Sequence, residues 1–380
     1  MVNAVAGTFS SLAFGGEGLM AAAFDILLLG AGHAHVVVLR QWAAHSIKAR
    51  RIALLSPSPY AWYSGMLPGL LAGHYRPEQC RIHLPPLCRA AGVEFIQGTL
   101  DILEADRKRV RLTDETWLQG QWLSVNTGSI PRLPECQRSS IEICPVKPFA
   151  DFLLTVERWQ KNPEPVAIIG GGAAGVELAL ALVHQTPSLA LFCGGTLLRG
   201  HPPSLRTRAL RHLRQRGIQV HEHCTADTLA GDKLMSGKQA VWQGNRVIMA
   251  TGPAPLAWWQ SSGLQCDRQG FIQSSATLQS PSHPHVFVTG DCAAIPNTPK
   301  NGVYAVRQGE VLANNLKRLF TRQPLVRFKP ATSALALLAD GQGGALMSWG
   351  PLTGEGRWAG RWKDFLDRRF IRHHSVDELI

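Results

Sequence analysis

Two glycine-rich turns are the residues whose type and spacing best define a chemistry in this sequence. Each follows a short apolar run, at residues 24–29 and again at residues 166–169, and each leads into another apolar segment. Glycine at such a turn lets the backbone approach a pyrophosphate, whose charge then lies at the N-terminus of the following helix. Two such turns in one chain predict two bound dinucleotides and electron transfer between them. The glycines are Gly30 and Gly32 in the first turn and Gly170, Gly172 and Gly175 in the second.

The first turn departs from the G-x-G-x-x-G pattern, because His35 stands at the third glycine position. Its ring either packs inside the fold or reaches the cofactor side of the turn. Ser56 follows the next predicted strand, residues 51–55, at the place where an acid would hold a ribose hydroxyl. We take both His35 and Ser56 as candidate cofactor-binding residues.

The second turn matches the pattern fully, and Glu177 follows two residues after its last glycine. Residues 192–195 read Phe-Cys-Gly-Gly where the ribose-binding acid is expected, so the sequence does not support a preference for NADH. Three arginines downstream could bind the 2′-phosphate of NADPH through paired hydrogen bonds, or could form a solvated helix face. NADH, NADPH and a degenerate site all stay open. The arginines are Arg199, Arg206 and Arg208.

Three further strands end in the same Thr-Gly pair. They close at Thr127-Gly128, at Thr251-Gly252 and at Thr289-Gly290, and Asp291 follows the last of them. The chain therefore reads glycine turn, Thr-Gly, glycine turn, Thr-Gly, Thr-Gly-Asp. We predict an α/β fold with two Rossmann-like domains that form an internal repeat, followed by a small C-terminal region.

This ordered set of motifs resembles the pyridine nucleotide-disulfide oxidoreductase superfamily over residues 24–320. The resemblance implies FAD at the first turn and at Gly290-Asp291, with NADH or NADPH at the second turn. It also implies that the second domain is inserted into the first. The expected limits are a leader at 1–23, an FAD domain at 24–144 and 264–325, an NAD(P)H domain at 145–263, and a C-terminal region at 326–380 with a basic aromatic helix.

Four shorter motifs narrow the resemblance within that superfamily. Gly-His-Ala-His at 32–35 and Tyr-Ser-Gly-Met-Leu-Pro-Gly at 63–69 are joined by the segments 299–309 and 362–370. Together they resemble the flavoprotein module fused ahead of selenide, water dikinase, itself similar to type II NADH dehydrogenases and sulfide:quinone reductases. The sequence ends at Ile380 without the kinase part, so selenophosphate synthesis is not assigned.

The predicted function is that of an FAD-dependent oxidoreductase that passes a hydride from NAD(P)H to flavin and then reduces a small-molecule acceptor. One alternative is a flavin-bound adaptor that couples redox state to a partner such as a selenium-handling enzyme. Another is a flavoprotein that oxidises sulfide or selenide.

The resemblance also implies roles for single residues. Glu177 would lie near nicotinamide and flavin, where it could orient the ring or handle a proton, and Asp291 would contact the ribityl chain. Gly302 would begin a helix whose N-terminus points at the flavin pyrimidine edge and stabilises negative charge there, with Lys300 in the preceding turn. Glu177 and Lys300 are the candidate catalytic residues. Gly302-Val303 replaces the Ala-Gln pair of type II NADH dehydrogenases, which puts a quinone acceptor in doubt.

The cysteines favour no metal or dithiol chemistry. The chain has eight, and none forms the Cys-x-x-Cys spacing typical of zinc sites and thioredoxin-like dithiols, so we expect no metal and free thiols in a reducing compartment. Cys136 and Cys144 lie in the crossover into the second domain and are the candidates for a redox pair. Buried thiols are the ordinary alternative.

A net charge of +12 favours anionic partners. Residues 357–372 interleave aromatic and basic side chains at helical spacing, which suits an interfacial membrane helix, a helix packed on the core or a dimer contact. No nucleic-acid recognition module accompanies this charge, so we expect no nucleic-acid binding. No apolar run approaches about 18 residues, and the leader lacks Lys and Arg. We therefore expect a cytoplasmic protein, with membrane association as an alternative, and leave its oligomeric state open.

Overall fold

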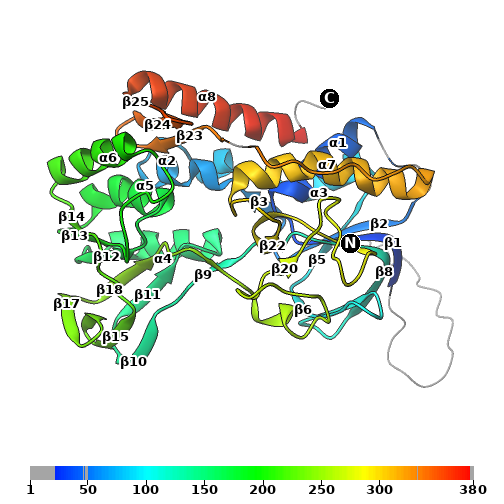
Figure 1. The fold of residues 1–380 in the computed structure, drawn as a ribbon, viewed down its shortest axis with the longest axis horizontal. Coiled ribbons are helices and arrows are strands. Elements are labelled where there is room, and N and C mark those ends of the chain that lie inside the picture. The colour runs from blue at the N-terminus through cyan, green and yellow to red at the C-terminus, as the bar shows by residue number, and fades with distance from the viewer. Residues whose placement is uncertain (1–21, 46, 48–49, 332, 377–380) are drawn as a thin grey trace, which may run out of the picture.

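The first sheet carries the first glycine turn. The computed structural model describes residues 22–45, 47, 50–331 and 333–376. Parallel strands run in the order β5, β2, β1, β8, with β21 also paired to β8, and antiparallel β7 and β6 extend the edge (Figure 1). Their bounds are β1 (Ala22–Leu29), β2 (Ile52–Ser56), β5 (Glu94–Gln97), β6 (Leu100–Glu104), β7 (Arg109–Leu112), β8 (Trp117–Val125) and β21 (Val286–Val288).

Burial explains why this strand order is stable. The run Ile-Leu-Leu-Leu at the end of β1 is fully buried, as expected for a central parallel strand covered on both faces. Three helices share one hydrophobic core with the sheet: α1 (His33–Ala44), α3 (Leu84–Ala91) and α7 (Gly302–Thr321). Helix α1 packs against both α3 and α7, so the first turn lies between two well-anchored elements.

The second sheet carries the second glycine turn and is wholly parallel. Its order is β11 (Glu142–Pro145), β18 (Arg246–Met249), β12 (Val166–Ile169), β13 (Leu189–Phe192) and β14 (Gln219–His221). It is accompanied by α4 (Phe149–Gln160), α5 (Ala173–Leu182) and α6 (Pro203–Gln215). A smaller sheet beside it contains β10 (Glu135–Ser139), β15 (Thr228–Gly231), β16 (Lys233–Ser236) and β17 (Gln239–Gln243).

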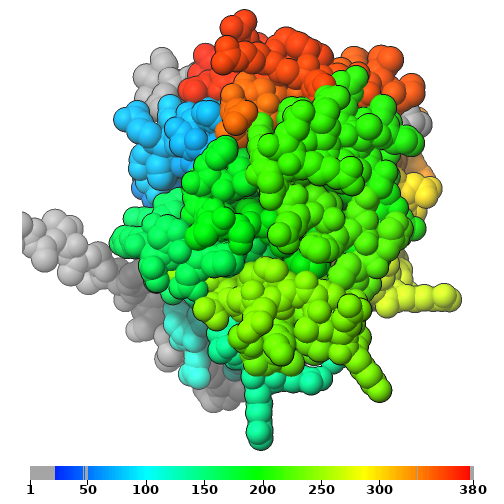
Figure 2. Space-filling view, turned by 90° about the vertical axis from the view of Figure 1, so that its left-hand side faces the viewer, coloured from blue at the N-terminus to red at the C-terminus, as the bar shows by residue number. Residues whose placement is uncertain are grey.

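The C-terminal region lies over both sheets' helices. Strands β23 (Ala336–Ala339), β24 (Ala345–Trp349) and β25 (Leu352–Gly356) form an antiparallel sheet, and α8 (Arg357–His374) follows directly. Helix α8 contacts all three strands and also α1, while β23 contacts α5 and β24 contacts α6. In Figure 2 these orange to red residues cover the green residues of the second unit and border the light-blue segment.

Short elements complete the fold. They are β3 (Tyr60–Trp62) paired with β4 (Arg81–His83), β9 (Ile130–Pro131) paired with β19 (Pro253–Ala254), β20 (Ile272–Gln273) paired with β22 (Ala293–Ala294), the helix α2 (Leu67–Leu71), and the single-turn helices η1 (Ser64–Met66), η2 (Pro77–Cys80), η3 (Val183–Gln185), η4 (Ala257–Trp259) and η5 (Gly290–Cys292).

The predicted fold class is confirmed: the protein is α/β with two parallel-stranded sheets, as in two-domain Rossmann-like proteins. The second sheet is built from chain that lies between β8 and β21, which are neighbours in the first sheet. It takes in β11, which begins before residue 145. The exact domain limits stay a prediction. Residues 1–21 of the predicted leader lie outside the described residues, and Ala22 already belongs to β1.

Candidate functional site

The first turn leaves the N-terminus of α1 open to an anion. Gly30 has a φ of +85°, and a Cβ there would lie 2.7 Å from the Asn126 carbonyl oxygen. Gly32 is the N-cap residue of α1, and as a glycine it has no side chain to cap this helix. Its free amide groups and the positive end of the helix dipole fit a pyrophosphate.

Asn126, which the sequence did not single out, holds the two halves of this site together. Its side-chain amide donates to the Thr289 carbonyl oxygen at 2.7 Å, and its Oδ1 accepts from the His35 amide at 3.4 Å. A Cβ at Gly290 would lie 2.3 Å from the Asn126 Nδ2 atom, so this approach requires glycine. Its place directly before Thr127-Gly128, as a polar residue ending a buried strand, was the available signal.

His35 supports the turn from inside. The ring is fully buried, its Nδ1 lies 2.5 Å from the Gly30 carbonyl oxygen and its Nε2 lies 2.8 Å from the Ser124 hydroxyl. The carbonyl can only accept, so Nδ1 donates to it and Nε2 accepts from Ser124. Burial lowers the pKa of His35 to about 4, which keeps the ring neutral. This geometry corresponds to the packed alternative that the sequence left open.

Asp291 follows β21 and lies in an ion pair that the sequence did not reveal. The Lys147 ammonium, from the segment between β11 and α4, donates to its carboxylate at 2.7 Å, and the Ser129 hydroxyl lies 3.4 Å away. The amide of Gly290 donates to the Gln308 side chain on α7 at 2.6 Å. The Thr-Gly-Asp segment is therefore held by side chains from three places: Ser129, Lys147 between β11 and α4, and Gln308 on α7.

Several buried polar atoms at this edge lack a partner within the described residues. They are the hydroxyls of Thr127 and Thr289 and the Nε2 atom of His33. Buried polar groups are nearly always hydrogen-bonded, so a cluster of unsatisfied ones indicates a polar ligand. Burial lowers the pKa of His33 to about 4 although Asp291 acts in the opposite direction. The cluster fits the ribityl and pyrophosphate part of FAD. Gly128, at the same strand end, has a φ of +74° with open space around its Cβ position.

The N-terminus of α7 meets the N-terminus of α1 at this place. A Cβ at Gly302 would lie 3.6 Å from the His33 Nε2 atom and 3.8 Å from the Ser64 hydroxyl. The Lys300 ammonium points elsewhere: it donates to the Ala293 carbonyl oxygen and lies 3.9 Å from the Phe271 ring centroid. Burial lowers the pKa of Lys300. Ser56, at the end of β2, donates its hydroxyl to the Ser58 carbonyl oxygen at 2.9 Å.

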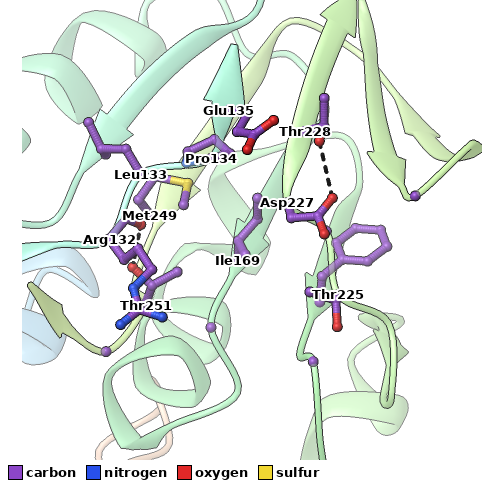
Figure 3. Close-up of a pocket in the computed structure, with 16 residues that line it drawn as sticks. Arg132, Leu133, Pro134, Glu135, Ile169, Thr225, Asp227, Thr228, Met249 and Thr251 are labelled. Carbon is purple, nitrogen blue, oxygen red and sulfur yellow. Dashed lines mark hydrogen bonds between the residues drawn. The ribbon is translucent and has the colours of Figure 1, made fainter. Parts of the chain in front are cut away.

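The second turn borders a cavity of about 600 Å³. Gly170, Thr251 and Gly252 line it together, and Figure 3 shows the labelled Thr251 beside Arg132. Gly170 has a φ of +135°, and a Cβ there would lie 2.1 Å from a backbone oxygen of the neighbouring strand. A Cβ at Gly175 would lie 1.8 Å from the Gly170 oxygen, so this glycine permits the close contact between α5 and β12. Gly172 caps α5 and faces open space.

The arginines considered for a 2′-phosphate already have acidic partners. Arg206 forms a two-bond ion pair with Glu222, which also accepts from the Leu197 amide at 2.6 Å. Arg208 lies 2.7 Å from Glu355 of β25. The apolar residues of α6 are buried, as the helical pattern predicts. Arg199 is exposed.

Glu177 lies in a cluster formed with α8. Its Oε1 accepts from the Ala339 amide at 2.7 Å, and burial raises the pKa of Glu177 to about 7 although Lys363 acts in the opposite direction. The Lys363 ammonium donates to Asp367 at 3.0 Å and to the Gly65 carbonyl oxygen at 2.7 Å. Lys363 and Asp367 belong to the motif at 362–370, but nothing in the sequence indicated that they approach Glu177.

Ser64 and Gly65 connect this cluster to the first site. The Ser64 hydroxyl lies close to Gly302, the first residue of α7. The Gly65 carbonyl oxygen accepts a hydrogen bond from the ammonium group of Lys363. The preceding residue, Tyr63, stacks on Phe370 of α8 with ring centroids 4.4 Å apart. One short segment therefore joins the N-terminus of α7 to the helix that follows the second glycine turn.

The cysteines form no pair that the structure shows. All eight are free thiols, with Cys136 exposed on β10 and Cys144 buried on β11. Burial raises the pKa of Cys144 to about 12, which keeps it as a poorly nucleophilic thiol. Among the described residues no group of His, Cys, Asp and Glu has the arrangement of a metal site.

The sequence profile of the pyridine nucleotide-disulphide oxidoreductase family matches residues 24–309. The chain belongs to this family. Its members are NAD(P)H-dependent flavin oxidoreductases that use FAD with NADH or NADPH. This is the family that the sequence predicted. Its members use the cofactor types expected from the resemblance.

Individual relatives are distant. The type II NADH:quinone oxidoreductase of Haemophilus influenzae is 26% identical over 191 residues, which cover 44% of this chain and 43% of the relative. The NADH dehydrogenase-like protein YutJ of Bacillus subtilis is 21% identical over 342 residues, covering 87% of this chain and 94% of the relative. The chain thus spans less than half of the first relative and nearly all of the second. The resemblance to the module fused to selenide, water dikinase stays a prediction.

A solved structure extends the likeness of the fold. The sulfide:quinone oxidoreductase of Aquifex aeolicus superposes with a TM-score of 0.76 at 18% identity, covering 94% of this chain and 92% of that one. The water-forming NADH oxidase of Lactobacillus brevis gives a TM-score of 0.69 at 19% identity, covering 86% and 75%. In the described part of this chain, no helix combines the length and apolar character that crossing a bilayer requires.

Proposed function

We propose that this protein takes a hydride from NADH or NADPH at the second glycine turn and delivers the electrons to a quinone-class acceptor. FAD, when bound at the first turn, supplies the redox chemistry that joins the two half-reactions. The observation that carries the proposal is a series of neighbours: Ser64 lies at Gly302, Gly65 accepts from Lys363, and the charge of Lys363 acts on Glu177. These partly buried polar residues link the two dinucleotide turns.

The residues of the first turn would bind and orient the flavin nucleotide. The N-terminus of α1 would hold the pyrophosphate, and Asp291 with Lys147 would hold hydroxyl groups beside the unsatisfied Thr127 and Thr289 hydroxyls. The N-terminus of α7 at Gly302 would stabilise negative charge at the ring. Lys300, which contacts Ala293 and Phe271, would fix the turn before α7 instead of touching the ring.

Glu177 would hold a proton close to the reacting rings. A carboxyl group whose pKa lies near 7 exchanges its proton readily at neutral pH, which is the property of a general acid or base. The Ala339 amide fixes its position, Lys363 favours its ionised form through its charge, and Asp367 keeps Lys363 in place. We therefore assign Glu177 the proton-handling role that the sequence left beside ring orientation.

The quinone-class acceptor is supported by the surroundings of α8. Tyr63 and Phe370 stack beside His33, and together they offer flat apolar surfaces close to the N-termini of α1 and α7. Type II NADH:quinone and sulfide:quinone oxidoreductases among the similar proteins are named for such an acceptor. The Gly302-Val303 pair argues against an unchanged quinone contact at α7, so we place the acceptor on the α8 side.

Contact with an anionic lipid surface belongs to the same proposal. Four apolar side chains on β24, β25 and α8 are more than half exposed, and basic residues share the exposed face of α8. Apolar side chains with flanking positive charge favour the interface of an anionic bilayer, where quinones dissolve. The apolar residues are Trp349, Leu352, Trp358 and Phe365, and the basic ones are Arg357, Arg361, Arg369 and Arg372.

The test is anaerobic bleaching of the purified yellow protein by NADH and by NADPH, followed by a short-chain ubiquinone analogue. We expect bleaching by at least one coenzyme and rapid return of the flavin absorbance with the quinone. Failure of both coenzymes would contradict the proposal and favour the adaptor alternative. Cys136→Ser and Cys144→Ser should retain full quinone reduction, and loss of activity in either would favour a cysteine relay to sulfide or selenide.

A further inference from the structure

The cavity at the second turn contains an acid that does not belong to the glycine fingerprint. In Rossmann folds the adenosine ribose lies at the end of the second strand, which here is β13. Gly194 follows that strand and lines the cavity, and a Cβ there would lie 3.1 Å from the Thr225 hydroxyl. The segment 225–228 therefore borders the expected ribose position. Figure 3 shows Asp227 in this segment, next to Thr225 and hydrogen-bonded to Thr228.

The described lining of the cavity has no guanidinium on the side of Asp227. Arg206 is bound on two nitrogens by Glu222. Among the described residues that line the cavity, Arg132 is the sole basic side chain, and Figure 3 places it with Thr251 on the side away from Asp227 and Thr225. Glu135 adds a second carboxylate to the lining.

These charges distinguish the two coenzymes. A carboxylate accepts hydrogen bonds from the hydroxyls of an adenosine ribose, and it repels a 2′-phosphate that carries a negative charge close to two. The acid missing after β13 is thus replaced by one that follows β14. Sequence spacing could not reveal this, because the usual acid is expected directly after the second strand.

We propose that Asp227 binds the adenosine ribose of NADH and makes this site select NADH over NADPH. The proposal rests on the second turn being the nicotinamide dinucleotide site of the proposed function. It assigns no role to Arg199 or Arg208, one of which is exposed while the other pairs with Glu355.

The test is isothermal titration calorimetry of the FAD-loaded protein with NAD⁺ and, separately, with NADP⁺. We expect NAD⁺ to bind at least about tenfold more tightly, since a hydrogen bond to a charged group contributes that much. Asp227→Asn should weaken NAD⁺ binding about tenfold and leave NADP⁺ binding unchanged or tighter. Asp232→Asn is the matched control, because Asp232 lies in the nearby turn after β15 and bonds Gln243 instead of lining the cavity.

Two results would overturn the inference: tighter binding of NADP⁺ than of NAD⁺ by the unaltered protein, or an unchanged ratio of the two affinities in Asp227→Asn. Calorimetry reads coenzyme binding, whereas bleaching by NADH reads the proposed electron transfer. A preference for NAD⁺ that depends on Asp227 but comes without bleaching would support this inference and contradict the proposed function. Bleaching by NADH together with equal affinity for both coenzymes would support the proposed function and contradict this inference.

Discussion

Glu177→Gln should change how the stability of the protein depends on pH. Burial raises the pKa of Glu177 from 4.5 to about 7 in the folded protein, so folding favours the protonated form. This contribution is fully present below pH 4.5 and is lost as the pH rises through 7. Each pH unit between the two values corresponds to about 1.4 kcal/mol, so ionised Glu177 costs about 3 kcal/mol of folding free energy. Glutamine resembles the protonated side chain and carries no such cost.

The assay is urea denaturation of the unaltered protein and of Glu177→Gln at about pH 5 and about pH 8. The stability of the variant relative to the unaltered protein should rise by about 2.5 kcal/mol over this range. Other titrating groups cancel in that difference. The control is Glu157→Gln, which makes the same substitution at an exposed position on α4.

The same substitution should alter the kinetics. The rate of flavin bleaching by NADH should show an inflection near pH 7 in the unaltered protein, and Glu177→Gln should remove it. A stability difference that stays constant from acid to alkaline pH would refute the reasoning, because Glu177 would then not be a buried carboxyl group that folding keeps protonated. Persistence of the inflection in Glu177→Gln would assign the ionisation to another residue.

Three further outcomes can be measured. Gly170→Ala places a methyl group against a backbone carbonyl at a φ of +135° and should lower Tm by several degrees, whereas Gly172→Ala, which meets open space, should leave Tm within about one degree and weaken only NAD⁺ binding. Asn126→Ala leaves the buried Thr289 carbonyl oxygen with only the weak Cys292 thiol donor and should cost about 1–3 kcal/mol while releasing FAD at a lower temperature, read by the rise in flavin fluorescence on heating. Retention of FAD up to the unaltered Tm would count against its bridging role. The pair Trp358→Ser and Phe365→Ser should reduce sedimentation with vesicles rich in phosphatidylserine, with quinone reduction in detergent unchanged, and equal sedimentation would remove α8 as the lipid contact.

The parts of the fold that the sequence predicts best are the ones set by local rules. Glycine turns follow the buried strands β1 and β12, and Thr-Gly pairs follow the carboxyl ends of β8, β18 and β21. The helix expected to begin at Gly302 does begin there, and it ends at Thr321, where Arg322 follows with a φ of +53°. These features depend on neighbours in the sequence.

The parts that could not be predicted depend on pairs far apart in the chain. Lys147 and Asp291 lie 144 positions apart, and nothing in either segment indicates the other. Glu177 binds the Ala339 amide and feels the charge of Lys363 only because the C-terminal sheet packs over α5. The sequence alone leaves Arg206 available for a phosphate. In the structure it is paired with Glu222, which lies 16 positions later and directly follows β14. The roles of the individual site residues accordingly stay predictions, for which the contacts give the tests.

The position of α8 gives the two dinucleotide sites a shared dependence on the last part of the chain. The charge of Lys363 acts on Glu177 in the helix of the second turn, and about two helical turns later Phe370 stacks on Tyr63 near the first. A single proteolytic cut before β23 would therefore detach both contacts at once, although each parallel sheet would keep all its strands. Such a cleaved protein would keep both sheets but lose the helix that holds the two dinucleotide sites at a fixed distance. Its rate of electron transfer should therefore fall by more than its content of bound FAD.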